Sequence, residues 1–214
     1  MRLALAATLA TLMLAPAVQG ETVAFDDSWK QQGFLRLSPN RYELGGGFMG
    51  ISSDNSVSLI YRPLPASLRH ATKARWNWSV TQSVPATDLQ TKGRDDRNIS
   101  LYFVFVDPAV AERLATASAR KIFGNKSMRT LVYVWGGDYA PDSVLDSPYQ
   151  PGQMMMLPIR PATTGTFNEQ VDLAADYRRA FGGEPGALAG MAVSADSDDT
   201  DTAVSARIEG LQLD

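Results

Sequence analysis

Two groups of carboxylates, far apart along the chain, carry most of the chemistry that the sequence offers. The first lies in residues 92–97 (Lys-Gly-Arg-Asp-Asp-Arg), directly before an apolar stretch, and the second fills residues 196–201 (Asp-Ser-Asp-Asp-Thr-Asp). Carboxylates can accept hydroxyl hydrogen bonds from a bound ligand, serve as the acid and base of glycan hydrolysis, or hold a calcium ion. These three kinds of chemistry define the functions to be weighed.

In the first group, Asp95 and Asp96 stand at the expected mouth of a buried strand that begins near Asn98. Adjacent strand residues point in opposite directions, so one carboxylate can face a cleft while the other pairs with Arg94 or Arg97. The alternative is that both acids bond the N–H groups of the loop and serve structure alone. The candidate ligand-binding residues of this group are Lys92, Asp95, Asp96 and Arg97.

The second group adds Asp196, Asp198 and Asp199 as candidate ligand-binding residues. Oxygen-rich loops suit calcium, and like charges so close together favour either a cation or basic partners. The helix–loop–helix calcium pattern fails, because its sixth position needs Gly and its twelfth an acid, where the chain has Asp201 and Arg207. Calcium in a sandwich loop therefore stays open as a cofactor. The alternative is a solvated acidic loop facing the basic residues of the first group.

Aromatic side chains offer stacking surfaces for a sugar ring. Trp76 and Trp78 fall on one face of an alternating strand, where aromatic rings usually belong to the core. Trp135 ends a run of aromatic and β-branched residues directly before two glycines. We therefore take Trp135 as the candidate ligand-binding aromatic.

Composition and charge argue against several classes of function. The 214 residues carry a formal net charge of −3, with 44% hydrophobic and 20% charged residues. Because Lys and Arg are scattered rather than gathered on one face, nucleic acid is not expected as a partner. Cysteine is absent, which excludes thiolate chemistry, and His70 is the only histidine. With no Gly-x-Ser-x-Gly motif, a Ser–His–Asp mechanism is not indicated.

The first twenty residues predict a secretory signal peptide. Arg2 gives a positive start, residues 3–14 are apolar, and small residues follow as far as Gly20. The apolar stretch is too short to span a bilayer, which needs about 20 residues, and nothing later predicts a membrane span. We expect residues 1–20 to be removed, residues 21–214 to form a single domain, and the protein to be periplasmic or secreted.

Strand patterns dominate the rest of the chain. Residues 75–80 alternate between apolar and polar side chains, and residues 57–61 do so apart from Ile60, which predicts strands with one buried face. Residues 101–106 and 131–135 are continuous aromatic and β-branched runs, typical of strands covered on both faces.

Only two helices are expected. One would cover residues 108–122 with Asp107 as its cap, and the other would begin near Asp172 and stop at two glycines. Many strands and few helices predict a mainly β fold, an antiparallel and jelly-roll-like β-sandwich with one or two short helices.

Several stretches together resemble a known family. They are residues 76–80 (Trp-Asn-Trp-Ser-Val), the charged motif at 92–97, the strand pattern at 101–105, residues 171–182 and the Asp-rich stretch at 194–200. In this order they resemble the exported bacterial proteins of domain of unknown function 3047, over residues 56–211. The resemblance implies no established activity. The family's strand order is similar to the jelly-roll sandwiches common among carbohydrate-binding modules, which is an analogy of fold.

Three functions stand as hypotheses. The first is a non-catalytic binding module for a saccharide or other polar ligand, whose hydroxyl groups would donate to the acidic loops. The second is a carboxylate-dependent glycan hydrolase that uses two of Asp95, Asp96, Asp198 and Asp199. The third is an envelope structural protein, which would show neither a groove nor an exposed aromatic side chain. Every proposal about a site requires the two acidic groups to meet at one edge of the sandwich.

Overall fold

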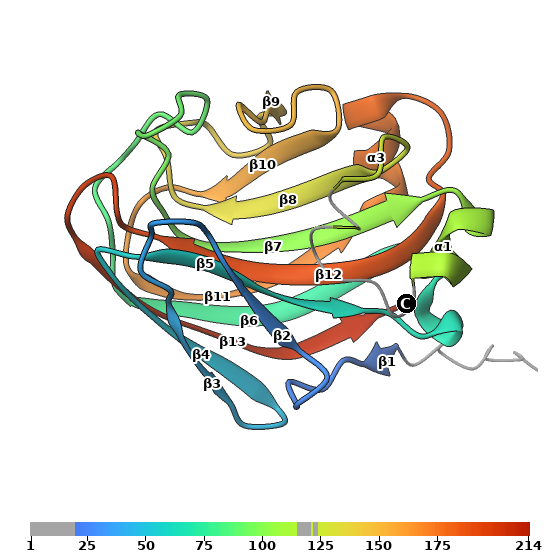
Figure 1. Cartoon of the computed structure of the whole chain (residues 1–214), viewed down its shortest axis with the longest axis horizontal. Coiled ribbons are helices and arrows are strands. Elements are labelled where there is room, and N and C mark those ends of the chain that lie inside the picture. Colours follow the sequence, from blue (N-terminus) through green and yellow to red (C-terminus); the bar gives the residue numbers. More distant parts are fainter. Residues whose placement is uncertain (1–19, 115–120, 122–123) are drawn as a thin grey trace, which may run out of the picture.

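The computed structural model describes residues 20–114, 121 and 124–214, and it shows two β-sheets packed face to face (Figure 1). The six-stranded sheet has the order β11 (Gly165–Asp172), β6 (Lys73–Gln82), β13 (Ala203–Leu213), β4 (Phe48–Asp54) and β3 (Arg41–Leu44), and β1 (Glu21–Thr22) pairs with β13. The seven-stranded sheet has the order β2 (Lys30–Gly33), β5 (Val57–Pro63), β12 (Ala187–Asp196), β7 (Arg97–Val106), β8 (Arg129–Trp135), β10 (Met154–Arg160) and β9 (Leu145–Asp146).

Strand pairing is antiparallel throughout the described part of the chain, except that β8 and β10 run parallel. The mainly β sandwich predicted from the sequence is confirmed.

Short helical segments join the strands. α1 (Pro108–Leu114) begins at the proline expected in its first position, while most of the predicted continuation to residue 122 lies outside the described residues. α3 (Leu173–Phe181) begins after Asp172, whose Oδ1 accepts a hydrogen bond from the Ala175 N–H at 2.8 Å. It ends at Gly182, where φ is 74°. The predicted start and stop of this helix are confirmed. A 3₁₀ turn, η1 (Ala66–Leu68), follows β5.

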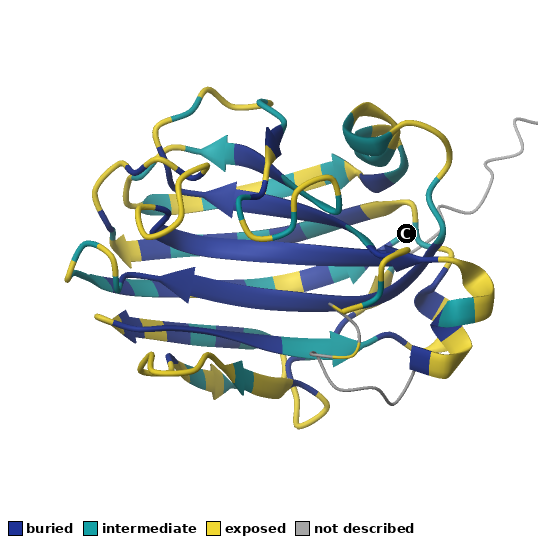
Figure 2. Cartoon of the chain, turned by 45° about the horizontal axis from the view of Figure 1, so that its top comes forward, coloured by how far each residue is buried: buried dark blue, intermediate teal, exposed yellow. Residues whose placement is uncertain are grey.

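The core lies between the two sheets and is rich in aromatic rings. Trp76 and Trp78 both belong to it, as their alternation on β6 predicted, and their ring centroids lie 5.4 Å apart in an edge-on arrangement. Every residue of β7 and β12, at the centre of the seven-stranded sheet, is buried (Figure 2). A continuous apolar run is what such a strand requires.

The face of the seven-stranded sheet that points away from the core positions the candidate site. At one end α1 packs on this face through Ala111 and Leu114. Further along, Leu89 covers it from a loop and Leu145 from β9. Between these covers, apolar side chains of the sheet line an open cleft.

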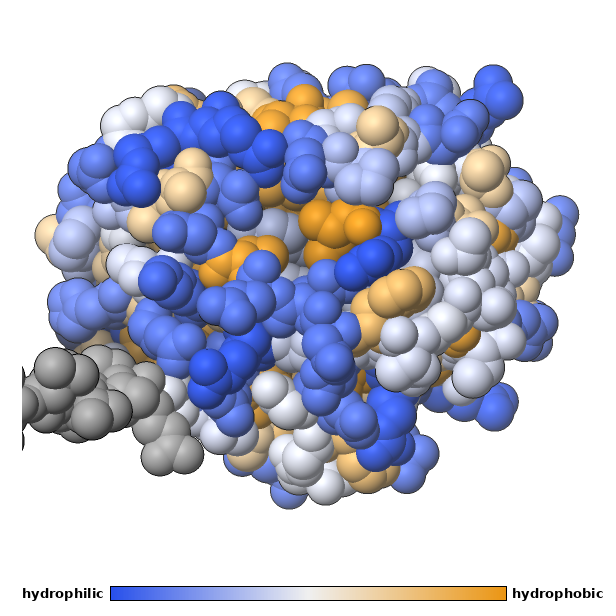
Figure 3. Space-filling view, turned by 180° about the vertical axis from the view of Figure 1, so that it is seen from behind, coloured by the Kyte–Doolittle hydropathy of each residue, from blue (hydrophilic) through white to orange (hydrophobic). Residues whose placement is uncertain are grey.

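From the side opposite to that of Figure 1, the surface is mostly hydrophilic, with hydrophobic residues in small separate areas (Figure 3). Among the described residues, no helix has the length and apolar character needed to cross a membrane. The signal peptide predicted for residues 1–20 lies, apart from its last residue, outside the described residues and stays a prediction.

Candidate ligand-binding site

Strand pairing brings the two acidic groups together. β7 begins at Arg97 and β12 ends at Asp196, and these two residues are partners in the antiparallel register, next to a β-bulge. The chain before β7 and the chain after β12 therefore meet at one edge of the sheet. Asp95 and Asp199 are in direct contact, since the Asp95 N–H donates to Asp199 Oδ2 at 3.1 Å. The two groups therefore meet at one edge of the sandwich, which every proposal about a site required.

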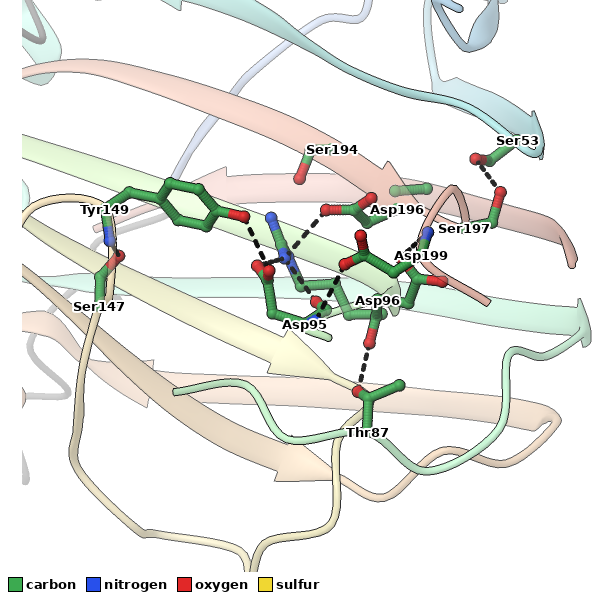
Figure 4. A network of polar contacts seen from close by, with 12 residues as sticks. Ser53, Thr87, Asp95, Asp96, Ser147, Tyr149, Ser194, Asp196, Ser197 and Asp199 are labelled. Carbon is green, nitrogen blue, oxygen red and sulfur yellow. Dashed lines mark hydrogen bonds and ion pairs between the residues drawn. The ribbon is translucent and has the colours of Figure 1, made fainter. Parts of the chain in front are cut away.

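Asp96 holds the Asp-rich loop in place. Its buried carboxylate accepts the Asp199 N–H at 3.2 Å and the Thr200 N–H at 2.8 Å, and it also accepts the Thr200 hydroxyl. Its main-chain oxygen accepts the Thr87 hydroxyl at 2.6 Å (Figure 4). Asp96 does not line the cleft. Its oxygens instead accept hydrogen bonds from the loop behind the cleft, as the structural alternative had it, so direct contact with an organic ligand in the cleft is not supported.

Arg97 lies buried between two carboxylates. Its Nη1 donates to Asp95 Oδ2 at 2.9 Å and lies 3.2 Å from Asp196 Oδ2, while Nη2 donates to the Tyr102 hydroxyl at 3.3 Å. Burial lowers the pKa of the guanidinium. The neighbouring Tyr102, Asp196 and Asp95 groups together raise this pKa by more than burial lowers it, so Arg97 stays charged. One buried cation thus serves two buried acids.

Asp196 is the most perturbed acid of the cluster. Burial raises the pKa of its carboxyl well above the usual value, Arg97 opposes this, and the adjacent Asp198 raises the pKa further. Its Oδ2 faces Arg97, whereas its Oδ1 has no hydrogen-bond partner among the described residues. The carboxyl therefore lies between a cation on one side and a second acid on the other.

The cleft beside this cluster has a volume of about 510 Å³. That is within the size range of small-molecule sites. Apolar residues of β5, β8 and β10 form its walls, namely Val57, Leu59, Val132, Met154 and Met156. One end is charged, and its lining includes Asp95, Arg97, Asp196, Asp198 and Asp199. The cleft thus combines apolar walls with a strongly polar end.

Two exposed aromatic rings stand at the rim and were missed from the sequence. Tyr149 is 55% exposed and Phe34 is 43% exposed, and both line the cleft. The Tyr149 hydroxyl donates to Asp95 Oδ1 at 2.8 Å, which links the ring to the acidic cluster (Figure 4). Both residues lie outside the named strands and helices, where no periodicity marks them. Tyr149 could be noticed only as an aromatic residue among Ser, Pro, Gln and Gly, and Phe34 carries no such signal.

Lys92 and Trp135 take other places than expected. The Lys92 ammonium lies 5.4 Å from the Tyr149 ring centroid, so it neighbours the rim without lining the cleft. Trp135 is fully buried against Trp78 and Phe167, with centroid distances of 5.6 and 5.1 Å. Trp135 points into the core with the alternate residues of β8, and the expectation that it stacks on a ligand is corrected.

A second, more open hollow of about 530 Å³ adjoins the cluster. It is polar, and its lining includes Asp88, Arg94, Asp138 and Tyr139. Asp199 lines both this hollow and the cleft, so the acidic cluster stands between them.

Together, the fold and the site define the class: a β-sandwich protein with an open, ligand-sized cleft on the outer face of one sheet. The chain belongs to the family described as Protein of unknown function (DUF3047), which matches residues 27–212. The family resemblance noted in the sequence is confirmed over nearly the whole chain.

Some solved structures are similar to this chain at low identity. The xyloglucanase domain of NopAA, a type three effector from Sinorhizobium fredii in complex with cellobiose, is 10% identical and has a TM-score of 0.46, covering 91% of this chain and 97% of that chain. The family 11 xylanase from Neocallimastix patriciarum is 9% identical with a TM-score of 0.37, covering 87% and 100%. At these identities the comparison concerns the fold alone. Comparison with curated proteins finds no match.

Proposed function

We propose that the protein is a non-catalytic binding module that takes a saccharide in the cleft of the seven-stranded sheet. The observation that carries this proposal is the direct bond between the Tyr149 hydroxyl and Asp95 at the cleft's charged end. It places a half-exposed aromatic ring and a buried acid–guanidinium pair side by side. Exposed aromatic rings beside convergent polar groups are the usual elements of a small-molecule site.

The two halves of the cleft suit the two sides of a sugar ring. A pyranose presents C–H groups on its faces and hydroxyl groups around its edge. Rings such as Tyr149 and Phe34, with the methionines of β10, supply apolar surface for the faces. Hydroxyl groups would donate to the acids at the charged end and accept from Arg97.

The bonding of the acids favours binding over catalysis. Glycan hydrolysis by two carboxyl groups needs one free to protonate the leaving oxygen and one free to attack or to activate water. Asp95 is held by Arg97 and Tyr149, and both oxygens of Asp96 accept hydrogen bonds from the loop, away from the cleft. These acids hold the structure of the site in place. A structural envelope role fits less well, because it would require neither a groove nor an exposed aromatic.

A glycan hydrolase is the second candidate, favoured by the fact that Asp95, Asp198 and Asp199 all line the cleft. The two candidates differ in what happens to a bound oligosaccharide. A hydrolase releases new reducing ends in proportion to enzyme concentration, and Asp198→Asn abolishes the release. A binding module leaves the oligosaccharide intact.

Binding is tested by screening the protein, without residues 1–20, against a panel of oligosaccharides and measuring the hits by calorimetry. Phe34→Ala should weaken binding at least tenfold, since it removes an aromatic contact at the rim. The matched control is Leu35→Ala, which truncates a neighbouring side chain that is 89% exposed and does not line the cleft. No binding to any saccharide, or equal binding by both variants, would reject the proposal.

Export to the periplasm or the medium is part of the same proposal, supported by the signal-peptide pattern of residues 1–20. The intact mass of protein recovered from the periplasmic fraction of an expressing bacterium tests it. We expect a chain that begins after Ala17 or after Gly20. Full-length protein confined to the cytoplasm would contradict export.

A further inference from the structure

We infer that Asp96, Asp196 and Asp198 form a binding site for a divalent cation, with Ca²⁺ as the best match. One carboxylate oxygen from each of these residues lies within 4.8 Å of the others. Oxygens that share a calcium ion at about 2.4 Å can be at most about 4.8 Å apart, on opposite sides of the ion. The three acids are therefore already close enough to share one ion. This site goes beyond the saccharide-binding function and does not depend on it.

An unsatisfied buried oxygen is the independent observation that points to a ligand. The Asp196 side chain is only 9% exposed, and its Oδ1 accepts no hydrogen bond from a donor among the described residues; the neighbouring Asp198 carboxyl can bond Asp196 only if the two acids share a proton. Buried polar atoms in native proteins are nearly always bonded, and an exception requires a cause such as an ion. A cation held between Asp196 and Asp198 supplies the missing partner. It also removes the repulsion between two adjacent carboxylates.

The other two acids keep acceptor capacity for the ion. Asp96 Oδ1 accepts one hydrogen bond, from the Asp199 N–H, and a carboxylate oxygen has room for two. Asp198 is half-buried and lines the cleft, so solvent can reach its side of the cluster. Water entering from the cleft can complete the coordination of the ion.

The charge balance favours a cation at the same place. Five carboxylates, from Asp95, Asp96, Asp196, Asp198 and Asp199, gather at this edge of the sheet. Arg97 is the cation buried among them, and it bonds Asp95 and Asp196. A divalent ion would balance two further charges.

The candidate ligands of this site are all carboxylate oxygens, and this favours some metals over others. Zinc and copper sites use histidine or cysteine, whereas calcium takes six to eight oxygens in irregular geometry and magnesium demands a regular octahedron. Three carboxylates on a strand end and a loop, with an open side toward the cleft, match calcium. Because Asp196 and Asp198 line the cleft, a bound ion would lie at its charged end.

Calorimetry on chelator-treated protein with CaCl₂ and MgCl₂ tests the site, together with thermal unfolding. We expect one Ca²⁺ per chain, a higher midpoint of unfolding with Ca²⁺, and weaker binding of Mg²⁺. Asp198→Asn should weaken Ca²⁺ binding at least tenfold; it is the variant of choice because Asp198 is the least buried of the three. Asp201→Asn is the matched control, an exposed acid of the same loop with φ of 49°, a conformation that Asn tolerates.

No heat and no thermal shift with either metal up to roughly 5 mM would overturn the site, since extracellular calcium modules bind at about 0.1–1 mM. Equal Ca²⁺ binding by wild type and Asp198→Asn would overturn it as well. In that case, a proton shared by Asp196 and Asp198 would account for the unpartnered oxygen. Saccharide binding is measured separately with Phe34→Ala, so the failure of one proposal is distinguishable from the failure of the other.

Discussion

Arg97 and Asp196 are paired twice, once as register partners of β7 and β12 and once as an ion pair with Nη1 and Oδ2 3.2 Å apart. The backbone pairing of two central strands therefore fixes the buried guanidinium against the acid. Arg97 also bonds Asp95, which precedes β7. The charged end of the cleft is thus built into the strand register, and its geometry should be lost only when the sheet itself is disturbed.

Replacing Arg97 should be one of the most damaging single changes in the site. Arg97→Met leaves Asp95 and Asp196 buried without their cation. Breaking a buried ion pair in this way costs about 3–5 kcal/mol of the free energy of unfolding. Urea unfolding at neutral pH measures the loss. The neighbouring Arg94 is exposed, so Arg94→Met should change the same free energy by no more than about 0.5 kcal/mol. Equal effects of the two substitutions would show that the Arg97 pairs contribute nothing.

Asp96→Asn should loosen the Asp-rich loop. The Asn side chain has only one oxygen. Its NH₂ group would therefore face at least one of the donors of Asp199 and Thr200 from which the carboxylate now accepts hydrogen bonds. A buried donor left unpaired costs about 1–3 kcal/mol. Hydrogen exchange at residues 199–200 should become faster in this variant, while Asp201→Asn serves as the unaffected control. Unchanged exchange at both positions would mean that Asp96 does not hold the loop.

The sandwich could be predicted because the burial of each strand face depends on local pattern, whereas the meeting of the acids was only a requirement of the site proposals. Alternation on β6 and the apolar run of β7 specify which faces are buried. The motif 92–97 directly precedes a strand and the acids at 196–201 directly follow one, so pairing of those two strands is sufficient to bring them together. Which strands pair was not predictable from period alone.

The rim of the cleft could not be predicted, for a physical reason. Whether an aromatic ring is exposed depends on packing across elements distant in sequence. Trp135 lies at a strand end but on the core side of β8, whereas Tyr149 lies in a loop whose course no periodic pattern sets. Loops at cleft edges have conformations fixed by tertiary contacts, here the bond from Tyr149 to Asp95.

The N-cap of α3 can be tested by a small and specific change. Asp172→Ala removes the acceptor of the Ala175 N–H and should lower the free energy of unfolding by about 1 kcal/mol. Asp172→Ser keeps a capping oxygen and should recover most of this loss. Chemical denaturation of the three proteins provides the comparison. If Asp172→Ser lost as much free energy of unfolding as Asp172→Ala, the capping bond would not be the cause of the loss.

Stability at high pH should depend on Tyr42. Burial raises the pKa of its hydroxyl to about 12, although the side chains of Ser58 and Asn40 act in the opposite direction. An unfolded tyrosine ionises near pH 10, so the folded protein holds this proton where the unfolded chain has already released it. The stabilisation that Tyr42 gives through its raised pKa is therefore fully present below about pH 10 and disappears as the pH rises toward 12.

Other buried tyrosines add to the same trend, so the difference between wild type and Tyr42→Phe isolates the effect of this residue. The variant loses the bond to the Ser58 carbonyl oxygen and should be less stable than wild type at pH 8. As the pH rises from about 10 to 12, however, its free energy of unfolding should fall by roughly 1–2 kcal/mol less than that of wild type. Urea midpoints across this range measure both slopes, and parallel slopes would show that Tyr42 ionises equally in the folded and unfolded chains.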